Sequence, residues 1–241
     1  MKKIFTVDFF YEKYGITKNT VKIIVITPVV ITALMMVVLL IPSTSKMGFW
    51  LLDENKPIEI LTFIVFILAG FYGLNLSIKL FKFKKLFPAL LYFIFSFCLI
   101  FLAMEEIAWG QWFFHFETPD SWKEINLRNE TTIHNIDGIQ GNTEILRLIY
   151  GVSGLIGIWF YRFYKFKDVY VPIILLPWFI VIIFHGSIDF YADIVSVGNR
   201  ADLILQESSE LIELLIAISS FIYLWLNSKM LKKDVFIPIV N

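Results

Sequence analysis

Residues 21–42 read VKIIVITPVVITALMMVVLLIP, and this run of apolar side chains decides the fold class. The hydrocarbon core of a bilayer is about 30 Å thick, and about 20 residues of α-helix cross it. The run is long enough for one crossing, and its only charged side chain is Lys22. Five more apolar runs follow, at residues 58–78, 87–104, 145–164, 169–190 and 203–226. The sequence therefore predicts six transmembrane segments.

The composition of the whole chain agrees with this assignment. Hydrophobic residues make up 58% of the sequence, whereas a soluble domain contains about 45–50% apolar residues. A chain that crosses lipid must satisfy its own backbone hydrogen bonds, as a helix or a closed barrel does. The alternating pattern of a barrel strand is missing from this sequence. We therefore expect an all-α bundle of six transmembrane helices, forming one membrane domain over residues 21–228.

The segments outside this domain are short. Residues 1–20 mix lysines with aromatic side chains and are predicted to form a cytoplasmic leader. Within it, residues 5–14 are predicted either to form an amphipathic helix on the membrane surface or to remain poorly ordered. Residues 229–241 are predicted to be a short cytoplasmic tail.

The distribution of lysine and arginine predicts the orientation of the bundle. Residues 79–85 contain four lysines and no acid, and residues 162–167 contain three basic side chains. Both loops lie on the same predicted side as the two termini, whereas acids predominate in the third and fifth loops. Because short loops rich in basic residues stay in the cytoplasm, both termini are predicted to be cytoplasmic. These basic residues lie where topology requires them, so nucleic-acid binding is not expected.

The loop over residues 105–144 is predicted to be extracytoplasmic and partly helical. It is longer than a helix connection needs, and its aromatic side chains argue against disorder. We expect the third helix to continue to about Phe116, followed by a short helix at residues 119–127 that Thr118 caps. The polar side chains of this loop are candidate site residues: Glu105, Glu106, Gln111, His115, Asn126, Glu130, His134 and Asn135.

The fifth segment adds two candidates to the same side of the membrane. His185 and Asp189 are four residues apart, which places them on one face of a helix. Such a pair can bind a metal together, or the carboxylate can orient the imidazole as a base. The alternative is a histidine that is hydrogen-bonded inside the bundle beside an interfacial aspartate.

The sixth segment carries Glu207, Glu210 and Glu213, of which Glu213 lies deepest in the apolar run. A charged side chain at the centre of a membrane helix costs at least about 2.5–3.5 kcal/mol. Glu213 is therefore predicted to face a partner or a cavity, or to carry a proton. Arg147, near the start of the fourth segment, is the predicted partner for one of these glutamates.

Glu105 and Glu106 are adjacent, so on a helix their side chains point about 100° apart. We therefore expect one of them to face the core of the bundle and the other to face a neighbouring helix or water. The alternative is two hydrated acids at the membrane surface. The apolar residues on both sides of the pair weaken this alternative.

The loop resembles a pattern found in bacterial polytopic membrane proteins of uncharacterised function. The similar stretches are EEIAWGQ at 105–111, ETP at 117–119, EINLRNE at 124–130 and HN at 134–135. The chain departs from that pattern at Ala108, where serine is usual, and at Ile133, where leucine is usual. The resemblance implies that this loop belongs to the functional site and that the protein is a multi-pass protein of a bacterial inner membrane. It implies no particular reaction.

The outline of the chain is also similar to that of ceramidase-like intramembrane hydrolases, in which histidines and acids at one end of a helical bundle hold zinc. This resemblance implies that His134, His185 and Asp189 are zinc ligands and that Glu105 or Glu106 activates a bound water. The chain departs from that family in its last helix, which carries glutamates in place of a histidine pair. A hard cation such as Mg²⁺ or Ca²⁺, held by the acids, is therefore the alternative.

Three classes of function remain after this reading. The first is an enzyme, a metal-dependent hydrolase or transferase, acting on a membrane lipid or a lipid-linked substrate. In that class Gln111, His115, Asn126, Glu130, Asn135, Glu210 and Glu213 are the predicted substrate-binding residues. The second is a proton- or cation-coupled transporter subunit, in which Glu213, Glu106 and His185 form the ion path. The sequence argues against this class, because no polar side chains are expected to continue the path toward the cytoplasmic side. The third is a non-catalytic membrane sensor or assembly component.

Overall fold

The structure, a computed structural model, describes residues 7–126, 130–133, 136 and 143–236. It is helical, with a single isolated backbone bridge, between Asn126 and Ile136, in the described part of the chain. Six helical segments are long and apolar enough to cross a membrane, which confirms the predicted number: Lys18–Leu40, Pro57–Lys82, Leu86–Glu106, Thr143–Arg162, Ile173–Ile194 and Asn199–Phe236. The main helices of these spans are α2 (Lys18–Leu40), α4 (Pro57–Lys82), α5 (Leu86–Glu106), α8 (Thr143–Trp159), α9 (Leu176–Ile194) and α10 (Asn199–Leu231).

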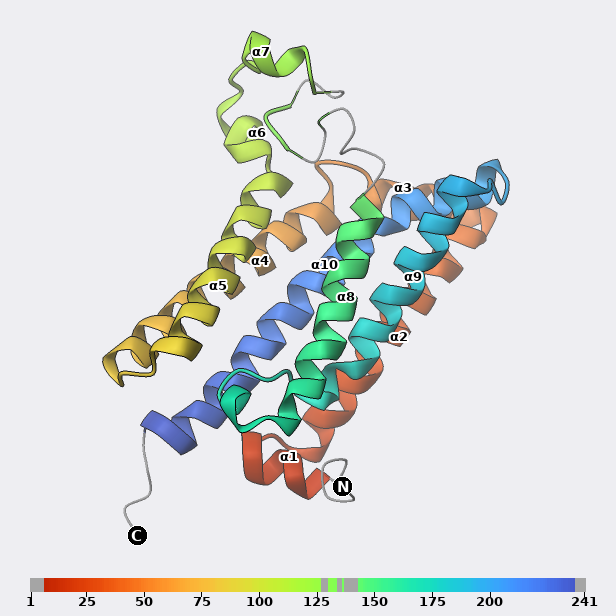
Figure 1. The fold of residues 1–241 in the computed structure, drawn as a ribbon. Coiled ribbons are helices and arrows are strands. Elements are labelled where there is room, and N and C mark those ends of the chain that lie inside the picture. The colour runs from red at the N-terminus through yellow and green to blue at the C-terminus, as the bar shows by residue number, and fades with distance from the viewer. Residues whose placement is uncertain (1–6, 127–129, 134–135, 137–142, 237–241) are drawn as a thin grey trace.

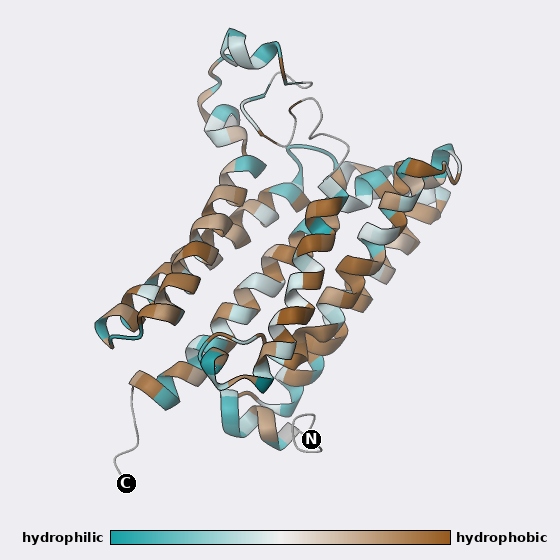
Figure 2. Cartoon of the chain, viewed as in Figure 1, coloured by the Kyte–Doolittle hydropathy of each residue, from teal (hydrophilic) through white to brown (hydrophobic). Residues whose placement is uncertain are grey.

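The outer faces of these helices are apolar. Leu34 of α2, Phe97 of α5 and Phe184 of α9 each expose more than half of their surface. Figure 2 shows hydrophobic residues along the length of the spans and hydrophilic residues gathered at the two ends of the bundle. A surface of this kind needs lipid as its solvent, and the chain is therefore a multi-pass membrane protein.

Helix α10 is the central element of the bundle, with α4 and α5 on one side and α8, α9 and α2 on the other (Figure 1). Its apolar side chains Leu211, Leu215 and Leu224 are almost completely buried. Close packing of α8 on α9 depends on Gly154, because a Cβ atom there would lie 2.3 Å from the ring of Phe179. Small residues at helix contacts are typical of membrane bundles, where packing holds the helices together.

A short helix, α1 (Val7–Tyr14), lies across the end of the bundle at which α10 finishes (Figure 1). Its side chains Phe10 and Tyr14 are buried, and the Tyr14 hydroxyl lies 2.8 Å from the Tyr170 hydroxyl. Lys233, just after α10, donates a hydrogen bond to the Glu12 carbonyl. Of residues 5–14, the structure describes Val7–Tyr14, and this part is helical; its position relative to a membrane surface stays a prediction. We call this end of the bundle the α1 end.

Helix boundaries differ from the predicted ones where proline intervenes. The first span ends at Leu40, because Pro42 forces the preceding Ile41 into an extended backbone conformation. Pro42 then begins an unpredicted helix, α3 (Pro42–Leu52), a position at which proline needs no hydrogen-bond donor. The fifth span begins at Ile173 instead of residue 169, directly after Pro172.

The prediction that the third helix continues to about Phe116 is wrong. Helix α5 ends at Glu106, and Ala108 and Trp109 adopt left-handed backbone conformations with φ of 45° and 55°. Two single helical turns follow, α6 (Gln111–Phe114) and α7 (Asp120–Lys123). Thr118 does not cap α7; its hydroxyl accepts a hydrogen bond from Gln111 instead. We call the end of the bundle where α5 ends and α8 begins the loop end.

Candidate functional site

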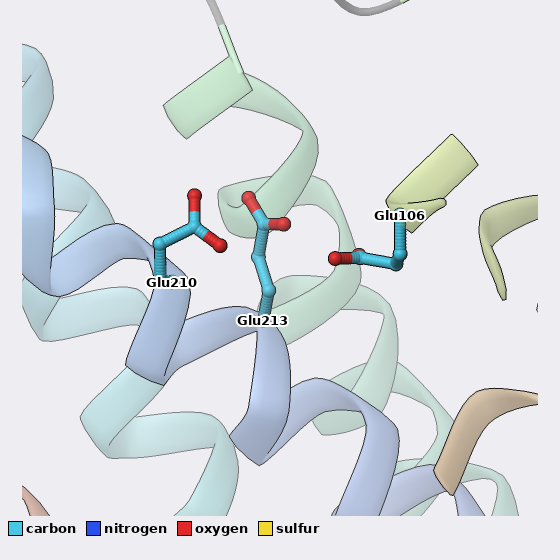
Figure 3. Close-up of side chains that lie close together, drawn as sticks. All are labelled: Glu106, Glu210 and Glu213. Carbon is cyan, nitrogen blue, oxygen red and sulfur yellow. The ribbon is translucent and has the colours of Figure 1, made fainter. Parts of the chain in front are cut away.

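Three glutamates converge at the loop end. Glu106 is the last residue of α5, and Glu210 and Glu213 lie one turn apart on α10. Taking one carboxylate oxygen from each glutamate, the three oxygens all lie within 4.8 Å of one another. Figure 3 shows Glu106 reaching from α5 toward Glu213, with Glu210 on the other side of Glu213. We call Glu106, Glu210 and Glu213 the acid cluster.

A buried arginine joins the acid cluster to the neighbouring helices. Arg147 of α8 is 4% exposed, and its Nη2 lies 2.7 Å from Asp189 Oδ2 on α9. Its Nη1 lies 3.4 Å from Glu213 Oε1 on α10. The predicted pairing of Arg147 with a glutamate is confirmed for Glu213, while the shorter contact goes to Asp189. One guanidinium therefore connects three helices.

His185 lies beside this arrangement but engages a different partner. The side chain is buried, and its Nε2 is 2.7 Å from Ser208 Oγ on α10. Because the Ser208 hydroxyl donates to the Leu205 carbonyl, Nε2 is assigned as the protonated nitrogen that donates to Ser208. Nδ1 is then an acceptor, buried and without a hydrogen-bond partner among the described residues. His185 and Asp189 share a face of α9 as predicted, but His185 hydrogen-bonds to Ser208 and Asp189 accepts from Arg147.

Glu105 faces away from the acid cluster and holds the loop. Its Oε1 accepts a hydrogen bond from the indole nitrogen of Trp109 at 2.6 Å, and its Oε2 accepts one from the backbone of Ile133 at 2.7 Å. A left-handed backbone conformation outside glycine costs about 1–2 kcal/mol per residue. Hydrogen bonds to a charged acceptor contribute about 1.5–3 kcal/mol each, enough to offset the strain at Ala108 and Trp109.

Two other predicted site residues belong to the same folded loop. Gln111 donates to Thr118 and accepts from the backbone nitrogen of Thr131 at 3.0 Å. Asn126 donates to the Thr132 carbonyl at 2.8 Å and accepts from the backbone nitrogen of Glu130 at 3.2 Å. These amides thus close the loop on itself by replacing missing backbone hydrogen bonds.

The remaining predicted residues do not join the acid cluster. Glu130 reaches this loop network through its backbone. His115 is exposed and ends α6 with a φ of 50°. His134 and Asn135 lie outside the described residues, so the proposed zinc set of His134, His185 and Asp189 is described only for its last two members. The loop also forms an open cavity of about 370 Å³ lined by Trp109, Phe116, Trp122, Thr131 and Ile133.

Among the described residues, carboxyl groups outnumber basic side chains around the acid cluster. The four carboxyl groups of the acid cluster and Asp189 lie near one described guanidinium, that of Arg147, which contacts Asp189 and Glu213. Glu59, in the first turn of α4, adds its charge to the field at Glu106 and Glu210. Ions removed from water need a counter-charge or must be neutralised by protons. The arrangement is therefore chemically suited to hold either a cation or shared protons.

The donor atoms indicate which cation would fit. All three ligands in the acid cluster are carboxylates, the donors that Mg²⁺ and Ca²⁺ prefer. Among the described residues, this is the one group of three such side chains whose ligand atoms come close together. The sequence placed these glutamates in two different roles. It gave no sign that the packing of α5 on α4, and of α4 on α10, places Glu106 at the height of Glu210 and Glu213.

Further polar groups lie along α10 toward the α1 end, contrary to the sequence-based expectation. The Tyr150 hydroxyl lies 2.9 Å from Ser219 Oγ and 2.8 Å from Ser220 Oγ. Farther along, Asn227 donates to the Tyr92 hydroxyl at 2.9 Å. Both serines and Asn227 are completely buried. The interior is therefore polar at several levels below the acid cluster.

Comparison with known proteins gives no family for this chain. No protein-family model matches it, and no curated protein or solved structure matches it significantly.

Proposed function

We propose that this chain is a membrane enzyme that holds a divalent cation in the acid cluster and acts on a lipid or lipid-linked substrate. The observation that carries the proposal is the convergence of Glu106, Glu210 and Glu213, with ligand atoms from two helices within 4.8 Å. A divalent cation at this point would balance the carboxylates that Arg147 leaves uncompensated. Mg²⁺ or Ca²⁺ fits the donors better than zinc, which usually takes nitrogen or sulfur ligands as well.

The surroundings of the acid cluster support a role in chemistry. A bound cation polarises a phosphoryl or carbonyl oxygen and lowers the pKa of a water it holds. Arg147 is close enough to favour an anionic substrate group at the same place. The aromatic cavity in the loop shares Trp109 with the network around Glu105, and a cavity of this size accepts part of a small apolar ligand. On the predicted topology this end faces the extracytoplasmic side of a bacterial inner membrane.

The first experiment measures metal in the purified protein. The detergent-solubilised protein is dialysed against equal concentrations of Mg²⁺, Ca²⁺, Mn²⁺ and Zn²⁺, then gel-filtered and analysed by plasma mass spectrometry. We expect one equivalent of a hard cation in the parent and less than a tenth in the double variant Glu210→Gln, Glu213→Gln. Glu207→Gln, on the same helix but outside the acid cluster, should keep the metal. Equal metal in all three proteins, or none in a folded parent, would refute the proposal.

Zinc bound by the parent protein would test the histidine-based site instead of the acid cluster. If the parent binds zinc, and His185→Ala loses it while the double glutamate variant keeps it, the histidine-based zinc set replaces the acid cluster as the metal site. Once a metal is assigned, substrates are found by incubating the loaded protein with phospholipids and lipid-linked phosphates, followed by mass spectrometry of the lipid extract. Turnover should require both the metal and Glu106.

The buried polar groups along α10 favour a second candidate, a proton-coupled transporter. In that case the carboxylates carry protons instead of a metal, and Tyr150, Ser220 and Asn227 continue the path inward. Proteoliposomes loaded with a pH-sensitive dye would then show proton flux, and Tyr150→Phe would abolish it. The metal-dependent enzyme predicts no flux and normal metal binding by Tyr150→Phe. If neither metal nor flux is found, the non-catalytic class remains.

A further inference from the structure

A second cavity lies at the α1 end, far from the acid cluster. Its volume is about 400 Å³, within the range of about 300–1,000 Å³ that small ligands occupy in proteins. Helix α1, the last turns of α8 and the segment leading into α9 enclose it. Its lining is mostly apolar and aromatic and includes one cation, with Phe9, Leu155, Ile158, Trp159, Leu176 and Arg162 among the residues.

A second cation lies against the wall of this cavity. The Nζ of Lys13 is 4.6 Å from the ring centre of Tyr170, 5.4 Å from that of Tyr161 and 5.7 Å from that of Phe9. All three rings line the cavity. Aromatic faces attract a cation, but they do not supply a counter-charge. The ammonium group is thus held at the cavity by the residues that form it.

Among the residues that the structure describes, neither cation has a direct partner. In the described part of the chain, no ion pair or hydrogen bond is formed by the side chain of Lys13 or that of Arg162. Asp234 is an acid whose charge acts on Lys13 without forming an ion pair with it. Burial nevertheless lowers the pKa of Lys13 from its ordinary value, because it outweighs the attraction of Asp234. Two cations beside an apolar chamber favour a ligand that is anionic at one end and apolar at the other.

The position of the cavity indicates where such a ligand comes from. Trp159 and Tyr161, at the end of the fourth span, line the cavity and are 50% and 39% exposed. Tryptophan and tyrosine are typical of the level of the lipid headgroups. The loop that follows adds Lys165 and Lys167, so this end of the molecule is basic as a whole. Basic pockets at the ends of membrane helices are suited to anionic lipid headgroups.

We propose that this cavity binds one anionic phospholipid from the surrounding leaflet, with its phosphate at Lys13 and Arg162 and an acyl chain among Leu155, Ile158 and Leu176. The lipid would bridge α1 to the end of α8 and the start of α9, a region to which α1 is already joined by the hydrogen bond between Tyr14 and Tyr170. This site is independent of the acid cluster and of the proposed reaction. A free phosphate ion would contact the two cations but leave the apolar part of the cavity empty. A binding measurement can therefore distinguish a lipid ligand from a free ion.

The test measures binding by native mass spectrometry of the full-length protein in a non-ionic detergent. Phosphatidylglycerol, phosphatidylcholine with the same acyl chains, and inorganic phosphate are titrated separately. We expect one phosphatidylglycerol to bind at least tenfold more tightly than phosphatidylcholine, and no comparable binding of inorganic phosphate. In the double variant Lys13→Gln, Arg162→Gln the affinity should fall about thirtyfold, as expected for the loss of about 1 kcal/mol at each of two basic residues near an anionic lipid. Lys165→Gln, on the same loop but outside the cavity, should bind like the parent.

A cavity-filling variant tests the apolar half of the site without changing charge. Leu155→Trp should weaken phosphatidylglycerol binding at least tenfold, whereas Ile156→Trp, on the exposed face of the same helix, should not. Far-UV circular dichroism confirms that each variant is folded. The proposal is overturned by equal binding of the two phospholipids, by unchanged affinity in the double variant, or by inorganic phosphate that binds as well as the lipid.

Discussion

Removing Arg147 tests the electrostatic interpretation of the loop end. The change is Arg147→Met, which keeps the apolar stem of the side chain and removes the guanidinium. Asp189, 8% exposed, then loses its partner at 2.7 Å, and Glu213 loses a weaker one at 3.4 Å. Leaving one partner of a buried ion pair uncompensated costs about 3–5 kcal/mol. An aspartate at the centre of a membrane helix costs about 2.5–3.5 kcal/mol.

We therefore expect Arg147→Met to lower the free energy of unfolding by about 3 kcal/mol, since the two ranges overlap there. The contact to Glu213 adds little, because the side chain of Glu213 is 30% exposed and water screens it. The assay is equilibrium unfolding in mixed micelles by titration with sodium dodecyl sulfate, followed by far-UV circular dichroism. Arg200→Gln is the control, because Arg200 is exposed and contacts only the Leu40 carbonyl among the described residues.

The double variant Arg147→Met, Asp189→Leu separates charge from packing. If the lost stability arises from an uncompensated carboxylate, removing that carboxylate should restore most of it, because an apolar pair in place of a buried ion pair is often neutral or stabilising. The coupling energy between the two positions then exceeds about 1.5 kcal/mol. A loss below 1 kcal/mol in the single variant, or a double variant as unstable as the single one, would refute the reasoning.

Three further predictions follow from the described contacts. Glu105→Gln should make the loop more sensitive to limited proteolysis without changing metal content, because Glu105 accepts from Trp109 and Ile133 and the amide replaces one acceptor with a donor. Gly154→Ala should lower the free energy of unfolding by about 1–3 kcal/mol through overpacking on α9, while the exposed Ser153→Ala should not; equal values would contradict the packing argument. Burial raises the pKa of Tyr14 above its ordinary value. The contribution of Tyr14 to the free energy of unfolding is therefore fully present below about pH 10 and decreases at higher pH, where the tyrosine ionises in the unfolded chain. Tyr14→Phe should reduce this decrease in unfolding titrations at high pH.

The sequence predicts those features of this molecule that depend on composition and spacing. The run at residues 21–42 is a span because of its length and apolar character alone. The face shared by His185 and Asp189 follows from helix geometry, and the pairing of Arg147 with Glu213 follows from the need to compensate a buried charge. Each of these inferences uses residues on one helix or a general energetic requirement. None requires knowing which helices are neighbours.

The acid cluster requires that knowledge, and so the sequence could not assemble it. Glu106 meets Glu210 and Glu213 because α5 packs beside α4, which in turn packs on α10, with the last turn of α5 at the level of the two glutamates. The apolar and aromatic pattern of residues 107–116 favours a continuing helix. The helix nevertheless ends, and the chain beyond it is held by hydrogen bonds to partners up to 28 residues away. One example is the bond from the Ile133 backbone nitrogen to the Glu105 carboxylate. Such long-range contacts leave no periodic signal.

The two adjacent acids, Glu105 and Glu106, have different roles because they leave the end of α5 in different directions. Because α5 ends at Glu106, the chain folds back over the end of the bundle and brings the backbone nitrogen of Ile133 to Glu105. With the helix ended, Glu105 holds Trp109 and Ile133, while Glu106, about 100° around the helix, enters the acid cluster. One acid is thus a positioning residue and the other belongs to the candidate metal site. Exchanging their roles would require a rotation of α5 that the packing of Ala103 and Leu99, both fully or nearly fully buried, does not allow.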